Sequence, residues 1–412
     1  MSTIGPLSND NPSGRATRPI PYREDGVIEI LFVDDEPSLL AGLRRMLYSM
    51  RSEWSMRFVG SAPEALEMLR EHPADVVVSD MRMPVMDGAT FLTHVREEFP
   101  DTVRIILSGY TEFASALRSV PVAHQFLNKP CDSAMLKTAV QRSCELQQRL
   151  MSTGLRRLVG AVGALPSPPH ILENLNRCLA SNEPSIDEVA KVISGDIAMT
   201  AKLLQLANSA FFGLAREVRE VSQAIAYLGL ATVRDLATAA EAFRSFTSTD
   251  PDIVSWVTEL EAHSADVATI ASQLTDDRDR AMDAYSAGLL HDIGNLVLAT
   301  TATDKFRSLR ASTAGDPIGN ERELLGATHA DLGAYLLTLW GLPYGLVDAV
   351  AHSHDASDQP WEMSVTHAVH VAEAISEERA GGPVTSPKAL DPNYLEALGI
   401  SSLVAELRAT SG

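Results

Sequence analysis

Five short apolar runs that alternate with helix-like segments constrain the fold of this chain more than any other feature of its sequence. The clearest run is Val76–Ser79, which ends at Asp80 and precedes Pro84 and Gly88. Such a run is typical of a strand buried on both faces of a sheet. The expected strands are residues 27–33, 56–60, 76–79, 103–107 and 122–127, and the expected helices are 37–47, 61–70, 90–98, 112–118 and a long helix from 132. This alternation predicts a doubly wound parallel α/β sheet.

Polar side chains follow four of these five strands at the point where each strand ends. They are Asp34 and Asp35, then Asp80, Ser108 and Lys129. In a parallel sheet the carboxyl ends of the strands share one edge, where open α/β proteins bind ligands. Carboxylates gathered there repel one another unless a cation lies among them, and an all-oxygen cluster suits Mg²⁺. Each residue alone is more simply a turn or capping residue, but five of them at one edge favour a site that stabilises a phosphoryl group on Asp80.

Four motifs occur in order along this half of the chain. They are Phe32-Val33-Asp34-Asp35-Glu36-Pro37, Asp80 with Met83-Pro84 and Asp87-Gly88, Ser108-Gly109, and Asn128-Lys129-Pro130. In order and spacing they resemble the receiver domain of two-component response regulators, a flavodoxin-like fold. The resemblance implies that a cognate histidine kinase phosphorylates Asp80. It also implies that Ser108 moves toward the phosphoryl group, that Phe126 turns inward with it, and that Lys129 stabilises it.

The resemblance also implies a magnesium ion beside the phosphorylation site. Its ligands would be the carboxylates of Asp34, Asp35 and Asp80 and the backbone carbonyl of Arg82. We expect this receiver domain to span residues 27–148.

The segments on either side of the expected receiver differ in composition from it. Residues 1–26 are rich in Pro, Ser, Asn and Arg, which is typical of a disordered tail. Residues 149–165 continue the last helix as a connecting helix, with Leu155, Val159 and Val162 on one face. This helix is either a spacer or a lever, or it is the seam of a homodimer.

Strand patterns stop after Pro169, and nearly every later segment has helical periodicity with Gly or Pro between segments. The second half is therefore expected to be an all-α domain over residues 155–375, followed by a helical tail over 376–412. Seven of the 11 histidines lie between residues 263 and 370, and His291 directly precedes Asp292 after an apolar helix. Facing helices can build a metal site from such residues. For any single histidine a hydrogen-bonded core position is the simpler explanation.

Several motifs of the second half resemble the HD-related output domain, HDOD, of the HD superfamily. They are Leu203–Gly213 with its Asn208-Ser209 pair, Leu290-His291-Asp292-Ile293-Gly294, Gly326-Ala327-Thr328-His329 and Trp340-Gly341-Leu342-Pro343. The resemblance implies a site for Fe, Mn or Zn. Its candidate ligands are His263, His291, Asp292, His329, His354 and Glu373.

This half departs from the catalytic relatives of the family in three places. Asn295 replaces a phosphate-binding lysine, and the paired histidines appear as His352-Ser353-His354. Glu373 occupies the position at which the catalytic relatives have a metal-binding aspartate, and its side chain is one methylene longer. Because the substrate anchors are largely lost, a degenerate site that is not an enzyme is favoured.

The combined resemblance predicts a phosphorelay response regulator whose phosphorylated receiver controls the HDOD domain. We expect this output domain to signal by contact with a protein partner. The first alternative is a metal-dependent phosphodiesterase acting on a cyclic-dinucleotide type of substrate. The second is a DNA-binding regulator, for which Ser222–Leu236 has a helix-turn-helix outline but offers few base-reading donors besides Arg234.

Charge and composition exclude several other classes of protein. The net charge of −20 over 412 residues argues against an extended nucleic-acid surface. No apolar run approaches the roughly 20 residues that a membrane helix needs, so we expect no membrane partner. Three cysteines without metal-like spacing fit a reducing compartment. A cytoplasmic location follows as an expectation.

Overall fold

The computed structural model of the chain describes residues 27–109, 122–149, 153–163, 165–181, 183–209, 217–238, 244–245, 250–312, 316–360, 362–381 and 384–409. The chain forms two compact units, and the main boundary between them lies between residues 163 and 164. The expected tail (1–26), the expected helix 112–118 and part of the motif at 203–213 lie outside the described residues. Among the described residues, no helix is long and apolar enough to cross a membrane.

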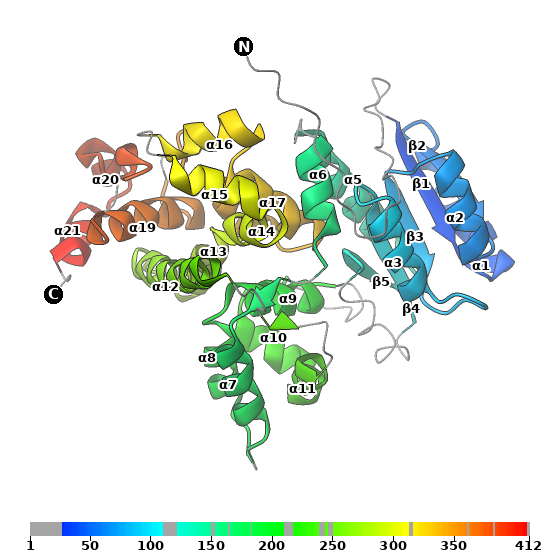
Figure 1. The fold of residues 1–412 in the computed structure, drawn as a ribbon, viewed down its shortest axis with the longest axis horizontal. Coiled ribbons are helices and arrows are strands. Elements are labelled where there is room, and N and C mark those ends of the chain that lie inside the picture. Colours follow the sequence, from blue (N-terminus) through cyan, green and yellow to red (C-terminus); the bar gives the residue numbers. More distant parts are fainter. Residues whose placement is uncertain are drawn as a thin grey trace. The chain divides into compact units, whose positions relative to one another are not determined.

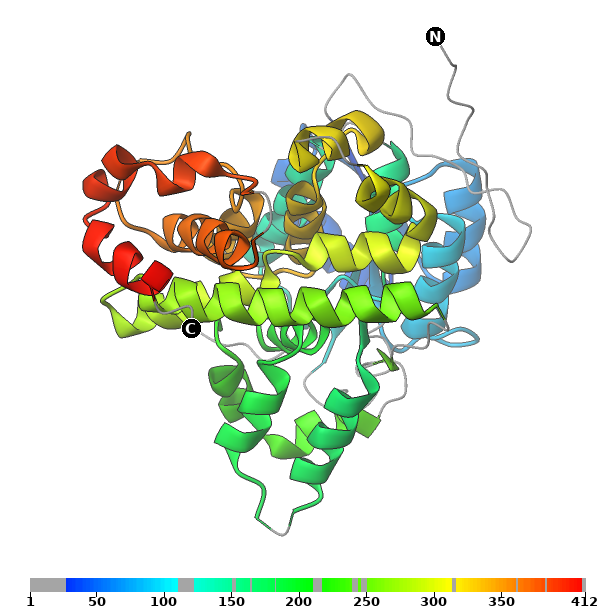
Figure 2. The same ribbon diagram turned by 60° about the vertical axis from the view of Figure 1, so that its left-hand side comes forward.

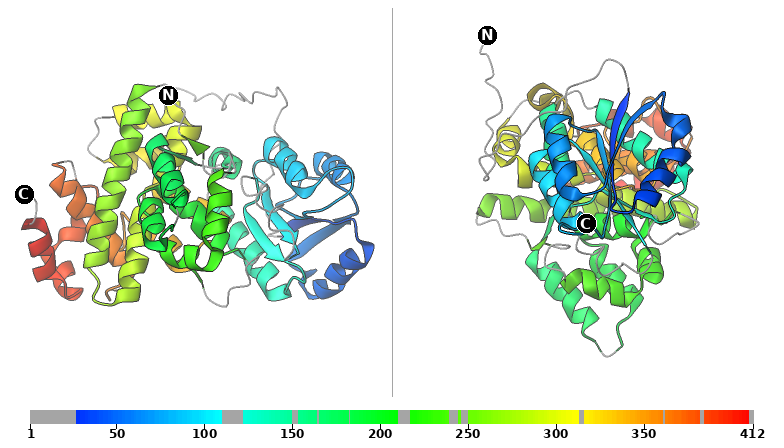
Figure 3. Two further views of the ribbon diagram at one scale, coloured as in Figure 1. Left: turned by 90° about the horizontal axis from the view of Figure 1, so that it is seen from below. Right: turned by 90° about the vertical axis from the view of Figure 1, so that its right-hand side faces the viewer.

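The first unit is built on a five-stranded parallel sheet in the order β2-β1-β3-β4-β5. The strands are β1 (Ile28–Val33), β2 (Trp54–Val59), β3 (Val76–Asp80), β4 (Val103–Ser108) and β5 (Gln125–Asn128). The helices described in this unit are α1 (Pro37–Met46), the short 3₁₀ turn η1 (Tyr48–Met50), α2 (Ala62–Glu71), α3 (Gly88–Glu98), α5 (Ser133–Arg149) and α6 (Thr153–Ala161). Figure 3 shows α2 and α3 on one face of the sheet and α1 and α5 on the other. The doubly wound α/β fold predicted from the alternation is confirmed.

Local sequence explains how the chain leaves the sheet near Asp80. The Asp87 side chain accepts a hydrogen bond from the backbone N–H of Thr90 and so caps α3. Gly88 packs against the end of β3 so closely that a Cβ there would lie 2.2 Å from the Asp80 carbonyl oxygen. Only glycine fits this approach. The turn after β3 is therefore held tightly at the residue on which the site depends.

Within the expected connecting segment (149–165) the structure describes one helix, α6, which packs on the first unit itself. Arg104, at the amino end of β4, is fully buried and donates hydrogen bonds to the Gly160 carbonyl of α6 and to the Val122 carbonyl. Arg157 of α6 forms an ion pair with the buried Asp101 at 3.2 Å. Leu155 and Val159 of α6 and Val162 directly after it are buried, whereas Leu158 is partly exposed. Most of this apolar face therefore packs within the chain itself.

The second unit is almost entirely helical, with one two-residue parallel pair, β6 (Pro166–Ser167) and β7 (Arg244–Ser245). Figures 1 and 2 show α12 running across this unit, with α7, α8, α10 and α11 on one side of it and the helices after α13 on the other. Its helices are α7 (Pro169–Leu179), α8 (Ile186–Ile193), α9 (Ile197–Ala207), α10 (Val221–Leu228), α11 (Leu230–Thr238), α12 (Pro251–Gln273), α13 (Arg278–Leu290), α14 (Ile293–Thr301), α15 (Thr303–Ala311), α16 (Pro317–Leu325), α17 (His329–Leu339), α18 (Tyr344–Ala351), α19 (Val365–Arg379), the 3₁₀ turn η4 (Pro387–Leu390), α20 (Pro392–Ala397) and α21 (Ser401–Ala409). The expected all-α character of this half holds apart from that short pair.

Two acidic side chains, the buried Asp196 and the partly buried Glu261, join α9 to α12. Asp196 caps α9 by accepting from the Met199 backbone N–H, and its carboxyl group shares a hydrogen bond with Glu261. Burial raises the pKa of Asp196 to about 6, and burial together with the Asp196 charge raises the pKa of Glu261 to about 9. Both carboxyl groups are therefore stabilised in their protonated form.

We expect Glu261→Gln to stabilise the protein at alkaline pH. Because both folded pKa values are raised, the pair stabilises the fold at acidic pH, and this contribution is lost as the pH rises through about 6 and then about 9. An amide keeps a hydrogen bond without an ionising proton. Urea unfolding at pH 8.5 should show the variant more stable than wild type by about 1–3 kcal/mol, with little difference at pH 5. An equal effect at both pH values, or an effect of the exposed control Glu259→Gln, would contradict this account.

Candidate functional site

The first candidate site is the carboxyl edge of the receiver sheet. The Lys129 ammonium lies 2.7 Å from Asp34 Oδ2 and also contacts Asp80 Oδ1. Asp34 and Asp80 are both buried, whereas Asp35 is exposed. Carboxylate oxygens of the three aspartates lie within 4.8 Å of one another. This all-oxygen donor set fits Mg²⁺.

Asp80 and Lys129 change each other's pKa through their contact. Burial raises the pKa of Asp80, and the Lys129 ammonium opposes this shift without cancelling it. Burial would lower the pKa of Lys129, but its hydrogen bonds to Asp34 and Asp80 raise it overall. The carboxylate that would attack a phosphoryl group is therefore desolvated and sits beside a fixed positive charge.

The remaining receiver residues singled out from the sequence lie around Asp80. The Arg82 backbone N–H donates to Asp80 Oδ2 at 3.2 Å. Ser108 is the last residue of β4, directly opposite Asn128 in β5, and its side chain is buried. Phe126, also in β5, is buried, so its aromatic ring already points inward.

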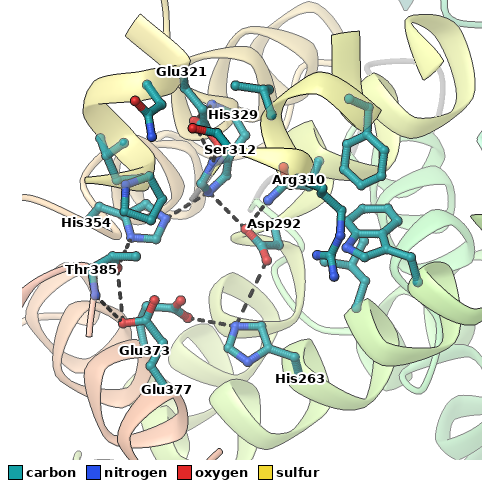
Figure 4. A pocket seen from close by; sticks show the side chains of 18 of the residues that line it. His263, Asp292, Arg310, Ser312, Glu321, His329, His354, Glu373, Glu377 and Thr385 are labelled. Atoms are coloured by element: carbon teal, nitrogen blue, oxygen red, sulfur yellow. Dashed lines mark hydrogen bonds and ion pairs between the residues drawn. The ribbon is translucent and has the colours of Figure 1, made fainter. Parts of the chain in front are cut away.

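The second candidate site is a ring of acidic and histidine side chains in the helical unit, drawn in part in Figure 4. Six residues expected from the sequence reach it from five helices and one loop. His263 lies in α12, His291 ends α13, Asp292 precedes α14, His329 begins α17, His354 follows α18 and Glu373 lies in α19. All six are at least half-buried, and His291 is completely enclosed. The fold therefore brings together every member of the predicted set.

Four residues of the ring form a first half-site. His263 Nε2 lies 3.0 Å from Glu373 Oε2 and 4.0 Å from Asp292 Oδ2. His291 Nε2 lies 2.8 Å from the same Glu373 oxygen and 3.6 Å from Asp292 Oδ2. Glu373 thus reaches the histidines despite its extra methylene. The four residues of this half-site offer two imidazoles and two carboxylates.

Asp292 also belongs to a second half-site. Its Oδ1 atom lies 2.9 Å from His329 Nε2, and His329 Nε2 lies 2.8 Å from His354 Nε2. Potential ligand atoms of these three residues all lie within 4.8 Å of one another, as they do for His263, His291 and Asp292. One carboxylate between two ligand groups is the arrangement of a two-metal site.

The far nitrogen of each histidine is held by a partner outside the ring. His291 Nδ1 donates to the Gly288 carbonyl at 2.6 Å, and His329 Nδ1 donates to Glu321 at 2.8 Å. His354 Nδ1 contacts the Thr385 hydroxyl at 3.0 Å, and His263 Nδ1 contacts the Ser376 hydroxyl at 3.3 Å. Partners of this kind orient metal-binding histidines and leave the Nε2 lone pair free.

The Nε2 atoms that point into the ring, those of His291, His329 and His354, are placed as metal ligands would be. His291 Nε2 is buried and lies 2.8 Å from Glu373 Oε2, but it makes no well-aligned hydrogen bond. His329 Nε2 and His354 Nε2 lie 2.8 Å apart, so one of the two nitrogens must carry a proton when no cation lies between them. Burial and the neighbouring His329 lower the pKa of His354 to about 4, so His354 stays neutral, as a metal ligand must be. The donor set of nitrogen and oxygen ligands suits Fe, Mn or Zn.

A cavity of about 570 Å³ adjoins the ring, and it is lined by both half-sites. Its outer wall includes Trp256 and Phe306, whose rings pack at 4.1 Å, and the Arg310 guanidinium lies over Trp256. The cavity is large enough for a small ligand to reach both half-sites.

Gly294 fixes the distance between α14 and α17 behind the ring. A Cβ at this position would lie 1.9 Å from the His329 carbonyl oxygen. We expect Gly294→Ala to destabilise the helical unit by about 3 kcal/mol or more, because backbone must move to relieve the clash. Urea unfolding would measure the loss. Gly345→Ala in α18 is the matched control, since nothing lies within 4 Å of its added methyl; equal stability of both variants would contradict the packing argument.

Three sequence interpretations change when the contacts are seen. Asn295, which replaces a lysine of catalytic relatives, donates its amide to Asp292 Oδ1 at 3.0 Å. His352 bonds to Asp348 and is absent from the ring formed by the described residues. Arg234, the one base-reading candidate of the helix-turn-helix outline, donates to the Leu179 carbonyl at the end of α7. That contact gives it a structural role and weakens the DNA-binding alternative.

Glu321 and Thr385 were missed entirely in the sequence. Neither lies in a motif, and Glu321 stands eight residues before His329 in a different helix. Their role follows from how α16 and the residues before η4 approach the ring, so no local pattern marks them.

Family models match both halves of the chain. The response regulator receiver domain matches residues 30–141, and the HDOD domain matches residues 165–356. An uncharacterized protein of Treponema pallidum is 24% identical over 234 residues, which cover 56% of this chain and 45% of that protein. The hydrogenase transcriptional regulatory protein HoxA of Cupriavidus necator is 38% identical over 120 residues, which cover 29% of this chain and 24% of that protein.

The chain spans less than half the length of these curated relatives. Among solved structures, the MmoQ response regulator of Methylococcus capsulatus is 24% identical, with a TM-score of 0.49. The match covers 60% of this chain and 98% of that one.

Proposed function

This chain is a response regulator in which a receiver domain precedes an HDOD output domain, and we propose that phosphorylation of Asp80 controls the HDOD domain. The receiver domain implies a histidine kinase as the phosphoryl donor. An Asp80 carboxylate oxygen would attack phosphorus as the nitrogen–phosphorus bond of the kinase's phosphohistidine breaks, which leaves an acyl phosphate. The contact of Lys129 with both Asp34 and Asp80 is the observation that carries this proposal.

Each receiver residue has a distinct part in that transfer. Asp34, Asp35, Asp80 and the Arg82 carbonyl would hold Mg²⁺, which supplies positive charge for the phosphoryl oxygens. Lys129 would exchange its ion pair with Asp80 for one with the phosphoryl group. Ser108 would then donate its hydroxyl to the same group, and Phe126 beside it would keep its inward position.

For the HDOD domain we propose a metal centre with two half-sites that share Asp292. His263, His291 and Glu373 complete the first half-site, and His329 and His354 complete the second. The buried His291 Nε2, which makes no well-aligned hydrogen bond, and the two ring nitrogens of His329 and His354, 2.8 Å apart, support a bound cation. Bound ions of this class polarise a substrate oxygen or activate water. Asn295 would hold Asp292 in place through its amide.

The output itself is proposed to be contact with a protein partner, whose access depends on the receiver state. A metal-dependent phosphodiesterase is the second candidate, favoured by the 570 Å³ cavity beside both half-sites. Its only described cationic lining residue is Arg310. A cytoplasmic location is part of the proposal, since all three cysteines are free thiols.

Hydrolysis distinguishes the two candidates. Metal-loaded wild type and a His291→Ala/Asp292→Ala variant would be incubated with a cyclic dinucleotide and with a generic phosphodiester. Turnover in wild type alone would establish the phosphodiesterase. Bound metal without turnover would favour the protein-contact output, with the centre as a structural or sensory element.

A further inference from the structure

Glu321 of α16 is a buried carboxylate that contacts one metal-site histidine at two points. Its Oε2 atom accepts the backbone N–H of His329 at 2.8 Å, and both of its oxygens lie 2.8 Å from His329 Nδ1. The residue is only 8% exposed. Figure 4 shows it behind His329, on the side away from Asp292. It therefore touches the ring from outside without being one of its inner ligands.

These contacts set the direction of the His329 lone pair. Because Nδ1 donates to Glu321, Nε2 is left to face Asp292 Oδ1 at 2.9 Å and His354 Nε2 at 2.8 Å. The second contact, to the backbone N–H, ties the carboxylate to the start of α17. The amino end of a helix favours negative charge there.

The two half-sites differ in the charge that they offer a cation. The first has Glu373 in addition to the shared Asp292, whereas the second has Asp292 and two imidazoles. Among the described residues, the outer partners of His263, His291 and His354 are hydroxyl or carbonyl groups, and only His329 is held by a carboxylate. Glu321 thus adds a second carboxylate beside the second half-site, behind His329.

We propose that Glu321 is the positioning residue that makes the second half-site able to hold a metal. The ions then bind in order, the first at His263, His291, Asp292 and Glu373 and the second at Asp292, His329 and His354. Loss of Glu321 leaves the first ion in place and releases the second. This inference rests on the proposed metal centre and adds a binding order to it.

Titration of metal-free protein with Mn²⁺ tests this order. Calorimetry would count the ions and their affinities, and electron paramagnetic resonance would report coupling between two neighbouring Mn²⁺ ions. Wild type should bind two ions and show that coupling. Glu321→Gln should bind the first ion with unchanged affinity, weaken the second about 10- to 100-fold, and lose the coupling. Glu323→Gln, an exposed position on the same helix, should behave as wild type.

A second control separates positioning from mere support of α16. Leu325 is buried in α16, so Leu325→Ala should lower the melting temperature but keep both ions. Equal affinities for both ions in wild type and Glu321→Gln would overturn the role of Glu321 and leave the metal centre intact. Loss of the second ion in Leu325→Ala as well would reduce Glu321 to a packing residue. A wild type that binds no ion would overturn the metal centre and this inference together.

Discussion

Asp80→Asn should abolish stable phosphorylation of this chain. Transfer from a small acyl phosphate donor in the presence of Mg²⁺ should label wild type, while the label on the variant should fall to background, at least about 100-fold lower. The reason is that an amide is a poor nucleophile and also removes one of the oxygens grouped for Mg²⁺. Retention of radioactive phosphate after gel separation measures the effect.

The matched control for that experiment is Asp87→Asn, in the same loop. Asp87 caps α3, and asparagine caps a helix about as well as aspartate does. This variant should therefore keep its label. Equal labelling of Asp80→Asn and wild type would contradict the assignment of the phosphoacceptor.

Asp292→Ala should remove every metal ion from the HDOD domain, since Asp292 lies in both half-sites. His354→Gln touches only the second half-site, so it should remove one ion and leave the other. Elemental analysis of purified protein measures the stoichiometry directly. The expected series is two ions in wild type, one in His354→Gln and none in Asp292→Ala.

Asp304→Ala is the control that removes a carboxylate from outside the ring. Its side chain is 99% exposed on α15, away from the ring, so the variant should keep both ions. Circular dichroism would establish that each variant is folded. Full metal content in a folded Asp292→Ala would contradict the shared-ligand arrangement.

The receiver could be predicted from sequence because its site follows from topology alone. Parallel strands bring their carboxyl ends to one edge, so Asp80 and Lys129 meet there whatever the loops do. The pattern predicted a helix in the region of α6 but did not show that this helix packs on the first unit. The buried contact of Arg104 with the Gly160 carbonyl depends on how a helix after the sheet packs against β4, and such tertiary contacts have no sequence period.

The ring of the HDOD domain could be predicted only in part, for a different reason. His291 and Asp292 stand together in a motif, but Glu321 comes from a helix that no motif marks. Its pairing with His329 arises because α16 turns back at Gly326, which has a positive φ of 81°. Asn295 was interpreted as a lost cationic anchor, whereas its amide in fact holds Asp292. Contacts of this kind depend on side-chain direction rather than on spacing.

Hydrogen–deuterium exchange of the HDOD domain, with and without the acyl phosphate donor, tests the central claim most directly. The claim that the receiver state controls the output predicts altered exchange in the second unit when wild type is phosphorylated, and no change in Asp80→Asn under the same conditions. A fully phosphorylated wild type whose HDOD peptides exchange as they do without the donor would contradict it.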